Sequence, residues 1–96
     1  MYNGVPRDHS QAAQWYRKAA QQGEAAALTN FGVMYHYGLG VPRDYVRAHM
    51  WFNLAASQGH KDGTKNRGIV AKRMTPAQIA EAQKLAREWA AKHGKK

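Results

Sequence analysis

A repeat of 36 residues constrains the fold of this chain more than any other feature of its sequence. The segment Gly4-Val5-Pro6-Arg7-Asp8 recurs as Gly40-Val41-Pro42-Arg43-Asp44. The same offset pairs small, aromatic and glycine residues further along: Ala12 with Ala48, Trp15 with Trp51, Tyr16 with Phe52, Ala19-Ala20 with Ala55-Ala56, and Gln22-Gly23 with Gln58-Gly59. A period of this length is typical of arrays in which each unit is a pair of helices. The repeat therefore predicts an all-α structure, an α/α solenoid.

The complete copy, residues 24–59, is predicted to form two helices. The first covers residues 25–37 and ends at Gly38 and Gly40, because glycine adopts left-handed backbone angles without steric cost. Pro42 prevents continuation, and Asp44 caps the next helix. That helix carries one apolar stripe with helical spacing: Ala48, Trp51, Phe52, Ala55 and Ala56. The stripe predicts that this helix buries one face against its neighbours, with Trp51 in the core.

Partial copies flank the complete one within a single domain of residues 1–96. Residues 4–23 form a partial repeat, in which Asp8 caps a helix over residues 9–22 and Gln11 takes the capping-box position. Residues 60–96 form a degenerate repeat and a cap. Residues 61–73 contain two glycines and predict a short or frayed helix. Thr75 and Gln78 form a capping box for a final helix, residues 75–92, that shields the last apolar face.

The composition does not support an enzymatic or metal-binding site. The chain has no cysteine, and its five histidines show no spacing typical of metal ligands. We find no paired carboxylates and no nucleotide-binding loop, so no catalytic residue, metal ligand or cofactor is predicted. No apolar stretch reaches membrane-spanning length, and no signal peptide is visible. These features leave the compartment open between cytoplasm and periplasm.

The complete copy resembles the Sel1-like repeat, a relative of the tetratricopeptide repeat. Phe31 stands where the family usually has leucine, and Phe52 where it usually has tyrosine. The segment from Met74 to Gln78 also looks like the closing segment of bacterial members. The positions that fill the family pattern are Ala25, Ala27, Phe31, Gly32, Tyr35, Gly38, Gly40, Val41, Asp44, Ala48, Trp51, Phe52, Ala55, Ala56 and Gly59.

The resemblance implies a solenoid that serves as an adaptor in protein complexes, with a protein as its partner. Extended concave surfaces are what such folds use for binding, and the first helices of the pairs line them. Candidate partner-binding residues are therefore the positions of the first helix outside the repeat pattern: Leu28, Thr29, Val33 and His36. For Leu28 and Val33 the alternative is ordinary packing against the next unit. A minor alternative is a hydrolase acting on a peptide-like ligand, because a cysteine-rich branch of the family has been linked to such ligands. This chain has none of those cysteines and shows no nucleophile with a base beside it.

The basic C-terminal segment supports an alternative function. Residues 61–96 hold ten bases and three acids, whereas residues 1–60 hold five bases and three acids. Such a segment can bind nucleic acid or another polyanion. The candidate contacts are Lys61, Lys65, Arg67, Lys72, Arg73 and the end of the last helix. No aromatic residue for base stacking lies among these bases in the sequence, which favours the adaptor interpretation.

The helix over residues 9–22 is expected to expose part of its apolar stripe, because the first copy lacks its own first helix. An exposed apolar patch tends to acquire a partner, and a second copy meeting it about a two-fold axis is the simplest one. The sequence thus predicts a homodimer with Trp15 and Tyr16 near the contact. The alternatives are that the chain is a fragment of a longer array or that this helix bends to bury its own stripe.

Overall fold

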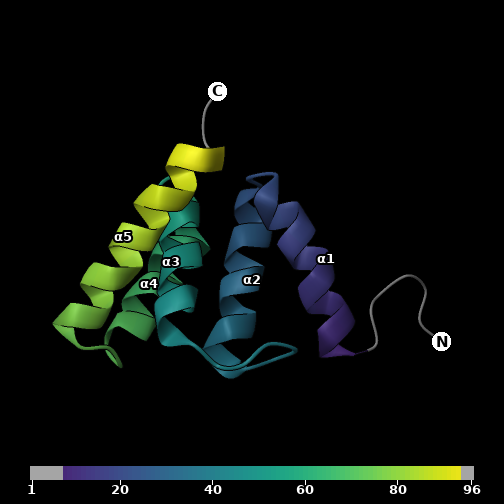
Figure 1. Cartoon of the computed structure of the whole chain (residues 1–96), viewed down its shortest axis with the longest axis horizontal. Helices are drawn as coiled ribbons and strands as arrows, with labels where there is room; N and C mark the ends of the chain where they lie inside the picture. The colour runs from purple at the N-terminus through teal and green to yellow at the C-terminus, as the bar shows by residue number, and fades with distance from the viewer. Residues whose placement is uncertain (1–7, 94–96) are drawn as a thin grey trace.

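Five helices make up the part of the chain that the computed structural model describes, residues 8–93, and this part contains no strand (Figure 1). The all-α prediction is thus confirmed. Each helix boundary in the complete copy agrees with the sequence within three residues. The repeated loop residues 4–7 lie outside the described residues. The helices are α1 (His9–Gln21), α2 (Ala25–Tyr37), α3 (Tyr45–Ala56), α4 (Lys61–Ala71) and α5 (Pro76–His93).

The two copies of the repeat begin their second helices with the same cap. The backbone N–H of Gln11 donates to Asp8 Oδ1 over 2.7 Å, and the N–H of Arg47 donates to Asp44 Oδ1 over 3.1 Å. Each bond satisfies an amide that has no partner within its helix. Equivalent residues thus start α1 and α3, and the 36-residue offset in sequence becomes an offset of one helical unit in space.

The loop between α2 and α3 needs its two glycines for different reasons. Gly38 ends α2 with a φ of 70°, where a side chain would be strained. Gly40 also has a positive φ of 78°, and a Cβ there would meet the carbonyl oxygen of His9 at the start of α1. The loop can therefore fold back against the neighbouring unit only because residue 40 has no side chain.

The core lies around α3, which packs against α2, α4 and α5. Trp51 is 6% exposed and lies between two aromatic rings, 5.1 Å from Phe31 of α2 and 5.7 Å from Trp89 of α5 by ring centroids. Phe52 is fully buried and packs with Val70 of α4. The prediction that this helix buries its apolar stripe, with Trp51 in the core, is consistent with this packing.

Helix α4 is continuous from Lys61 to Ala71, shorter than the 61–73 segment but not interrupted at its glycines. Gly63 is buried, and a Cβ there would lie 2.6 Å from Ala55 Cβ. The missing side chain is therefore a packing requirement, because it lets α4 approach α3 closely. A Cβ at Gly68 would meet nothing within 4 Å, so only Gly68 matches the purely unfavourable role expected for both glycines.

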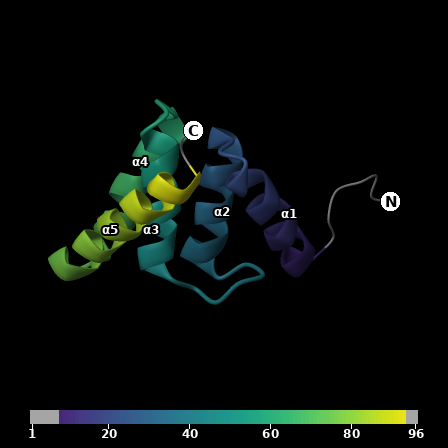
Figure 2. The ribbon, with the colours of Figure 1, turned by 45° about the horizontal axis from the view of Figure 1, so that its top comes forward.

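Helix α5 begins with the predicted capping box. The backbone N–H of Thr75 donates to Gln78 Oε1 over 2.9 Å, and the N–H of Gln78 donates to Thr75 Oγ1 over 3.1 Å. The helix packs mainly on α3 and not on α4, with Ala82 and Ala86 buried (Figure 2). It covers α3 on one side of the array, while α1 lies on the other side of α2 (Figures 1 and 2).

Candidate functional site

A groove of about 520 Å³ lies between α1 and α2. Small, aromatic and polar side chains line it. Apolar concave surfaces with a few polar groups are the usual form of binding sites on proteins. The lining residues are Trp15, Tyr16, Lys18, Ala19, Gln22, Glu24, Ala26, Ala27 and Asn30.

Trp15 is the most exposed aromatic residue of this groove. It is 62% exposed, and its ring lies edge-on to the half-buried ring of Tyr16, with 6.3 Å between centroids. On the same helix Ala13 and Ala20 are buried against the rest of the fold. Trp15 lies two residues beyond Ala13 and therefore points to a different side of α1. The helix buries its small residues and leaves the indole available, as the predicted contact at Trp15 and Tyr16 requires.

The four predicted partner-binding positions of α2 are occupied by contacts within the fold. Leu28 is fully buried in the core, and Val33 is half-buried against the cluster around Phe52. The hydroxyl of Thr29, 6% exposed, lies 3.0 Å from Nδ1 of His60 on the next unit. A partner cannot reach Leu28 or Thr29 without separating α2 from its neighbours. For Leu28 and Val33, the structure matches the alternative of ordinary packing.

The fourth predicted position, His36, lies beneath a small surface pocket of about 240 Å³. It is 8% exposed, its ring stacks on Tyr37 at 4.4 Å, and Tyr45 meets it edge-on at 5.5 Å. Burial and the positive charges of Arg73 and Arg43 lower the pKa of His36 from its ordinary value of 6.5. The imidazole therefore stays neutral at neutral pH and contributes packing surface, not charge.

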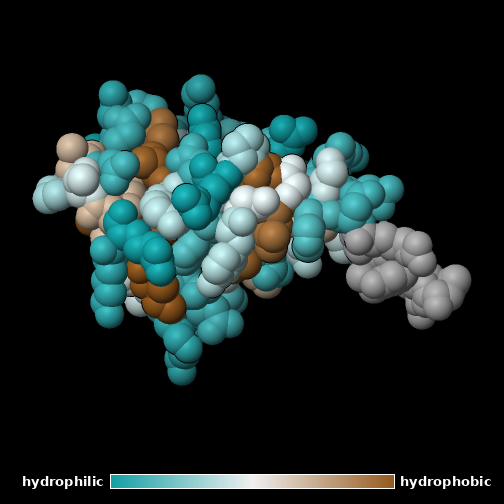
Figure 3. Space-filling model, turned by 90° about the horizontal axis from the view of Figure 1, so that it is seen from below, coloured by the Kyte–Doolittle hydropathy of each residue, from teal (hydrophilic) through white to brown (hydrophobic). Residues whose placement is uncertain are grey.

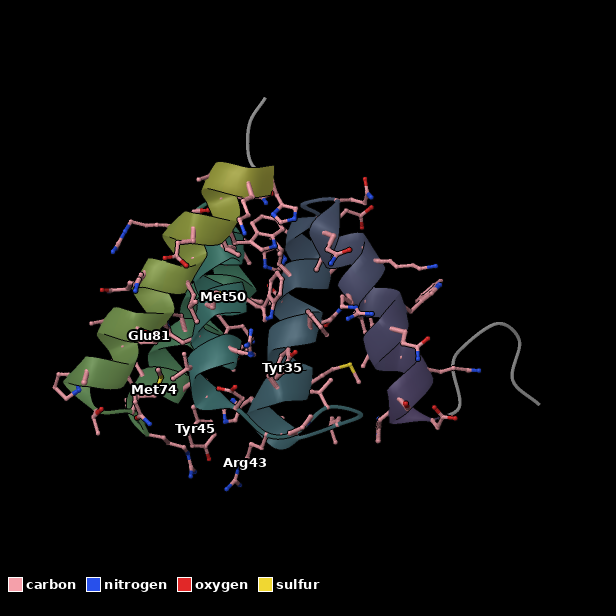
Figure 4. All side chains as sticks on the ribbon, viewed as in Figure 1. Tyr35, Arg43, Tyr45, Met50, Met74 and Glu81 are labelled. Atoms are coloured by element: carbon pink, nitrogen blue, oxygen red, sulfur yellow. The ribbon has the colours of Figure 1, made fainter. Side chains whose placement is uncertain are left out.

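The same pocket brings together residues that are distant in sequence. Arg43 lies 5.3 Å from the centre of the Tyr45 ring, and Figure 4 shows both side chains at the end of the bundle where α2 joins α3. Arg73, Tyr37 and Ile69 complete the pocket, and Tyr37 is 64% exposed. This face is largely hydrophilic, with separate hydrophobic patches (Figure 3). Aromatic rings thus accompany basic residues here, contrary to the sequence-based expectation, because the α2–α3 loop carries them to the end of α4.

The other predicted polyanion contacts do not join this pocket. Arg67 donates from Nη1 to Asn53 Oδ1 over 2.6 Å and is partly buried by that bond. Lys61, Lys65 and Lys72 are exposed on α4 or just after it. Of the five predicted bases, only Arg73 lines the aromatic pocket.

Two side chains of α3 have buried nitrogen atoms without a hydrogen-bond partner. His49 is 3% exposed and its Nδ1 has no hydrogen-bond partner, nor has Nε1 of Trp51. Burial, with the positive charge of Arg67, lowers the pKa of His49, while a backbone hydrogen bond opposes that shift. Across residues 8–93 no three His, Asp or Glu side chains gather as a metal site would require. No helix among these residues is long and apolar enough to cross a bilayer.

Sequence reasoning missed most of the groove. Lys18, Gln22, Ala26 and Asn30 line it, yet none was predicted as a contact, and the positions predicted on α2 pack within the fold. The repeat contained the signal that identified Trp15 and Tyr16, and the same signal extends to Ala19. The residues equivalent to 15, 16 and 19, at positions 51, 52 and 55, are buried.

Comparison with known proteins agrees with the repeat architecture. The family model for the Sel1 repeat matches residues 1–24 and 25–60. Among solved structures, c5321 of uropathogenic Escherichia coli, a protective antigen displaying an SLR fold, is 45% identical with a TM-score of 0.88. The match covers 94% of this chain and 20% of that protein, so the chain spans about a fifth of its length. A search of curated proteins finds no match.

Proposed function

Because the chain belongs to the Sel1 repeat family, we propose that it is a non-enzymatic scaffold that binds a protein partner. Proteins built from Sel1 repeats generally mediate protein–protein interaction, and their fold is typically a scaffold without catalytic activity. The observation that carries the proposal for this chain is the groove between α1 and α2, which Trp15, 62% exposed, helps to line.

The chemistry of the groove fits a protein ligand. The few residues that carry most of the binding energy at protein interfaces are enriched in tryptophan and tyrosine. Here Trp15 and Tyr16 lie beside the small side chains of Ala19 and Ala27, and Lys18 and Glu24 stand nearby. A partner that covers the two rings would remove apolar surface from water, which is the main driving force for such association.

We retain the hypothesis that the partner binds a concave surface, but we assign that surface to different residues. Leu28 and Thr29 pack inside the fold, whereas Ala26 and Asn30 of α2 are exposed and are part of the groove. A ligand at this site would contact α1 and α2 together. The binding surface we propose is thus the seam between two units and not one face of α2.

The homodimer stays a prediction. A second copy that meets α1 about a two-fold axis would cover Trp15 and Tyr16 of both copies. Light scattering at micromolar concentration measures the mass directly. A dimer that Trp15→Glu converts to a monomer supports this form of the proposal, and a monomer mass for the unmodified chain contradicts it.

Site-specific photo-crosslinking in the native cells tests the scaffold function itself. A photoreactive amino acid at Gln22, in the groove, should give a protein adduct that the same group at Lys65, exposed on α4, does not give. The adduct should disappear when Trp15→Glu is added. Equal adducts from both positions, or no protein adduct from Gln22, would contradict protein binding at the groove.

The polyanion alternative has one observation in its favour, the pocket that combines Arg43 and Arg73 with Tyr37 and Tyr45. Aromatic rings beside cations suit single-stranded nucleic acid, which stacks its bases and pairs its phosphates with basic side chains. A salt titration of binding to single-stranded and duplex DNA tests it. A steep loss of affinity with rising salt, removed by Arg43→Gln with Arg73→Gln, supports this alternative; no binding at low salt contradicts it.

A further inference from the structure

The groove between α1 and α2 has an occupied equivalent one repeat further along. Adding 36 to the numbers of its lining residues leads to α3 and the start of α4, and helix α2 packs against both of those helices. Four groove residues correspond to residues that contact α2 or the turn that leads into it. They are Trp15, Tyr16, Gln22 and Glu24, equivalent to Trp51, Phe52, Gln58 and His60.

Two of these contacts are aromatic. The Trp51 ring lies 5.1 Å from Phe31 of α2, and the Phe52 ring lies against the backbone at Gly32. A Cβ on Gly32 would lie 2.5 Å from the Phe52 ring, so the ring occupies the space that a side chain would take. A helix that covered Trp15 and Tyr16 in the same way would need an aromatic residue followed by glycine.

The other two contacts are polar and fix the direction of the covering helix. Gln58 donates from Nε2 to the carbonyl oxygen of Gly23 over 2.7 Å, just before α2 begins. His60 Nδ1 lies 3.0 Å from the hydroxyl of Thr29 in the first half of α2. In the groove, Gln22 takes the place of Gln58 and Glu24 the place of His60. A helix docked as α2 is would thus accept from Gln22 and donate a threonine hydroxyl to Glu24.

We infer that the groove binds a helix of the α2 type from a partner protein. A carbonyl group just before this helix would accept from Gln22, and a hydroxyl on the helix would donate to Glu24. An aromatic–glycine pair of the helix would lie over Trp15 and Tyr16. This inference rests on the proposed scaffold function and names the ligand of its groove. The repeat supports it directly, because this chain already binds such a helix with the equivalent residues of α3 and α4.

A second copy does not supply that helix while it remains folded. Leu28, Phe31 and Gly32 of its own α2 are buried against its own α3, so they are not available to another chain. Helix α1 of a second copy lacks the required order of residues, since it contains neither glycine nor threonine. The symmetric dimer through α1 is therefore a different occupant, and the experiment below separates the two.

A peptide with the sequence of residues 23–38 is the probe, and it contains no tryptophan. Labelled with fluorescein, it should bind the full chain saturably at one site, as fluorescence anisotropy measures. Trp15→Glu should weaken binding at least about tenfold, or about 1.4 kcal/mol. The matched control Gln14→Glu adds the same charge at an exposed position outside the groove and should leave the affinity unchanged. Equal binding by both variants would overturn the inference.

A variant of the peptide separates docking from helix formation. Gly32→Ala raises the intrinsic helicity of the peptide, because alanine is the better helix former. It should nevertheless bind about tenfold more weakly or worse, because its methyl group takes the space that Tyr16 needs. Stronger binding of this peptide would show that helicity alone controls the affinity and would overturn the inferred fit.

The outcomes also distinguish this inference from the proposed function. If the peptide fails to bind a monomeric chain, while crosslinking from Gln22 still gives a Trp15-dependent adduct, the helix-type ligand is wrong and the scaffold function stands. If the free chain is instead a dimer dissociated by Trp15→Glu, a second copy occupies the groove and the inference is overturned. If neither peptide nor protein binds, both proposals fail.

Discussion

Two tryptophans at the same position of the repeat have opposite environments in this molecule. Trp51 is 6% exposed between Phe31 and Trp89, whereas Trp15 is 62% exposed at the edge of the array. Their helices start with the same aspartate cap and differ in their neighbours. The comparison teaches that the repeat sequence specifies a face to be covered, while burial depends on which helix is present to cover it.

Removing each indole should give the largest difference in the free energy of unfolding between the two positions. Trp51→Ala should lower the free energy of unfolding by about 3–5 kcal/mol, because it empties a buried aromatic site. Trp15→Ala should change it by less than about 0.5 kcal/mol, because the ring is mostly in water already. Urea denaturation followed by circular dichroism measures both. Equal losses would mean that the two faces are equally covered, contrary to the structure.

The two glycines of α4 allow the same comparison within one helix, because Gly63 packs against α3 and Gly68 has open space around it. Gly63→Ala should cost about 1–3 kcal/mol, because its Cβ would press on Ala55 and force α4 away from α3. Gly68→Ala, with open space around it, should stabilise the chain by about 0.5–1 kcal/mol through higher helix propensity. Thermal melting compares the pair, and a stabilising Gly63→Ala would contradict the close approach of the two helices.

The two aspartate caps offer a smaller test of whether α1 opens independently of the rest of the fold. Asp44→Ala should lower the global stability by about 0.5–2 kcal/mol, because it releases the first turn of the central helix α3. Asp8→Ala removes an identical cap, but should act mainly on α1, which packs mainly on α2. Amide hydrogen exchange should show faster exchange in α1 alone for Asp8→Ala, and exchange raised throughout would contradict that independence.

The smallest expected effect is a pH dependence from the buried His49. Its pKa is lowered in the fold, so between its folded pKa and the ordinary value of 6.5 the unfolded chain binds a proton that the folded chain does not. The stabilisation from neutral His49 is therefore complete above pH 6.5 and is lost as the pH falls toward the folded pKa.

Replacing His49 by leucine should make the loss of stability below pH 6.5 shallower, as denaturation at several pH values measures. A slope equal in His49→Leu and the parent would contradict the assignment of this pH dependence to His49.

The sequence predicted the helices well because their ends have local causes. Asp8, Asp44, Thr75 and Gly38 act on residues within four positions of themselves, and all four occupy the predicted places. The sequence did not predict that α5 packs mainly on α3, since this depends on how the chain turns after α4. Gly63 was misread for a similar reason, because its role depends on Ala55 of another helix.

The candidate site was less predictable than the fold. Periodicity identifies the apolar stripe of a helix but not which of several neighbours covers each part of it. Leu28 was therefore left between a partner contact and ordinary packing, and the structure buries it within the fold. The repeat indicated that the stripe at Trp15 is exposed, as the structure has it, while the contact predicted there stays a prediction. The sequence did not predict the basic pocket at Arg43 and Arg73, because the pocket is formed by a loop and the end of a helix that is distant in sequence.

The central claim is that the face around Trp15 is the uncovered counterpart of the face around Trp51, and the indole N–H signals in a two-dimensional ¹H–¹⁵N spectrum test it most directly. Without ligand, the Trp15 signal should exchange rapidly with water, while the Trp51 signal, from a buried atom, should be protected. Addition of the peptide of residues 23–38 should shift and protect the Trp15 signal and leave that of Trp51 in place. A Trp15 signal that is protected from the start, or that stays unchanged while another indole shifts, would contradict the account.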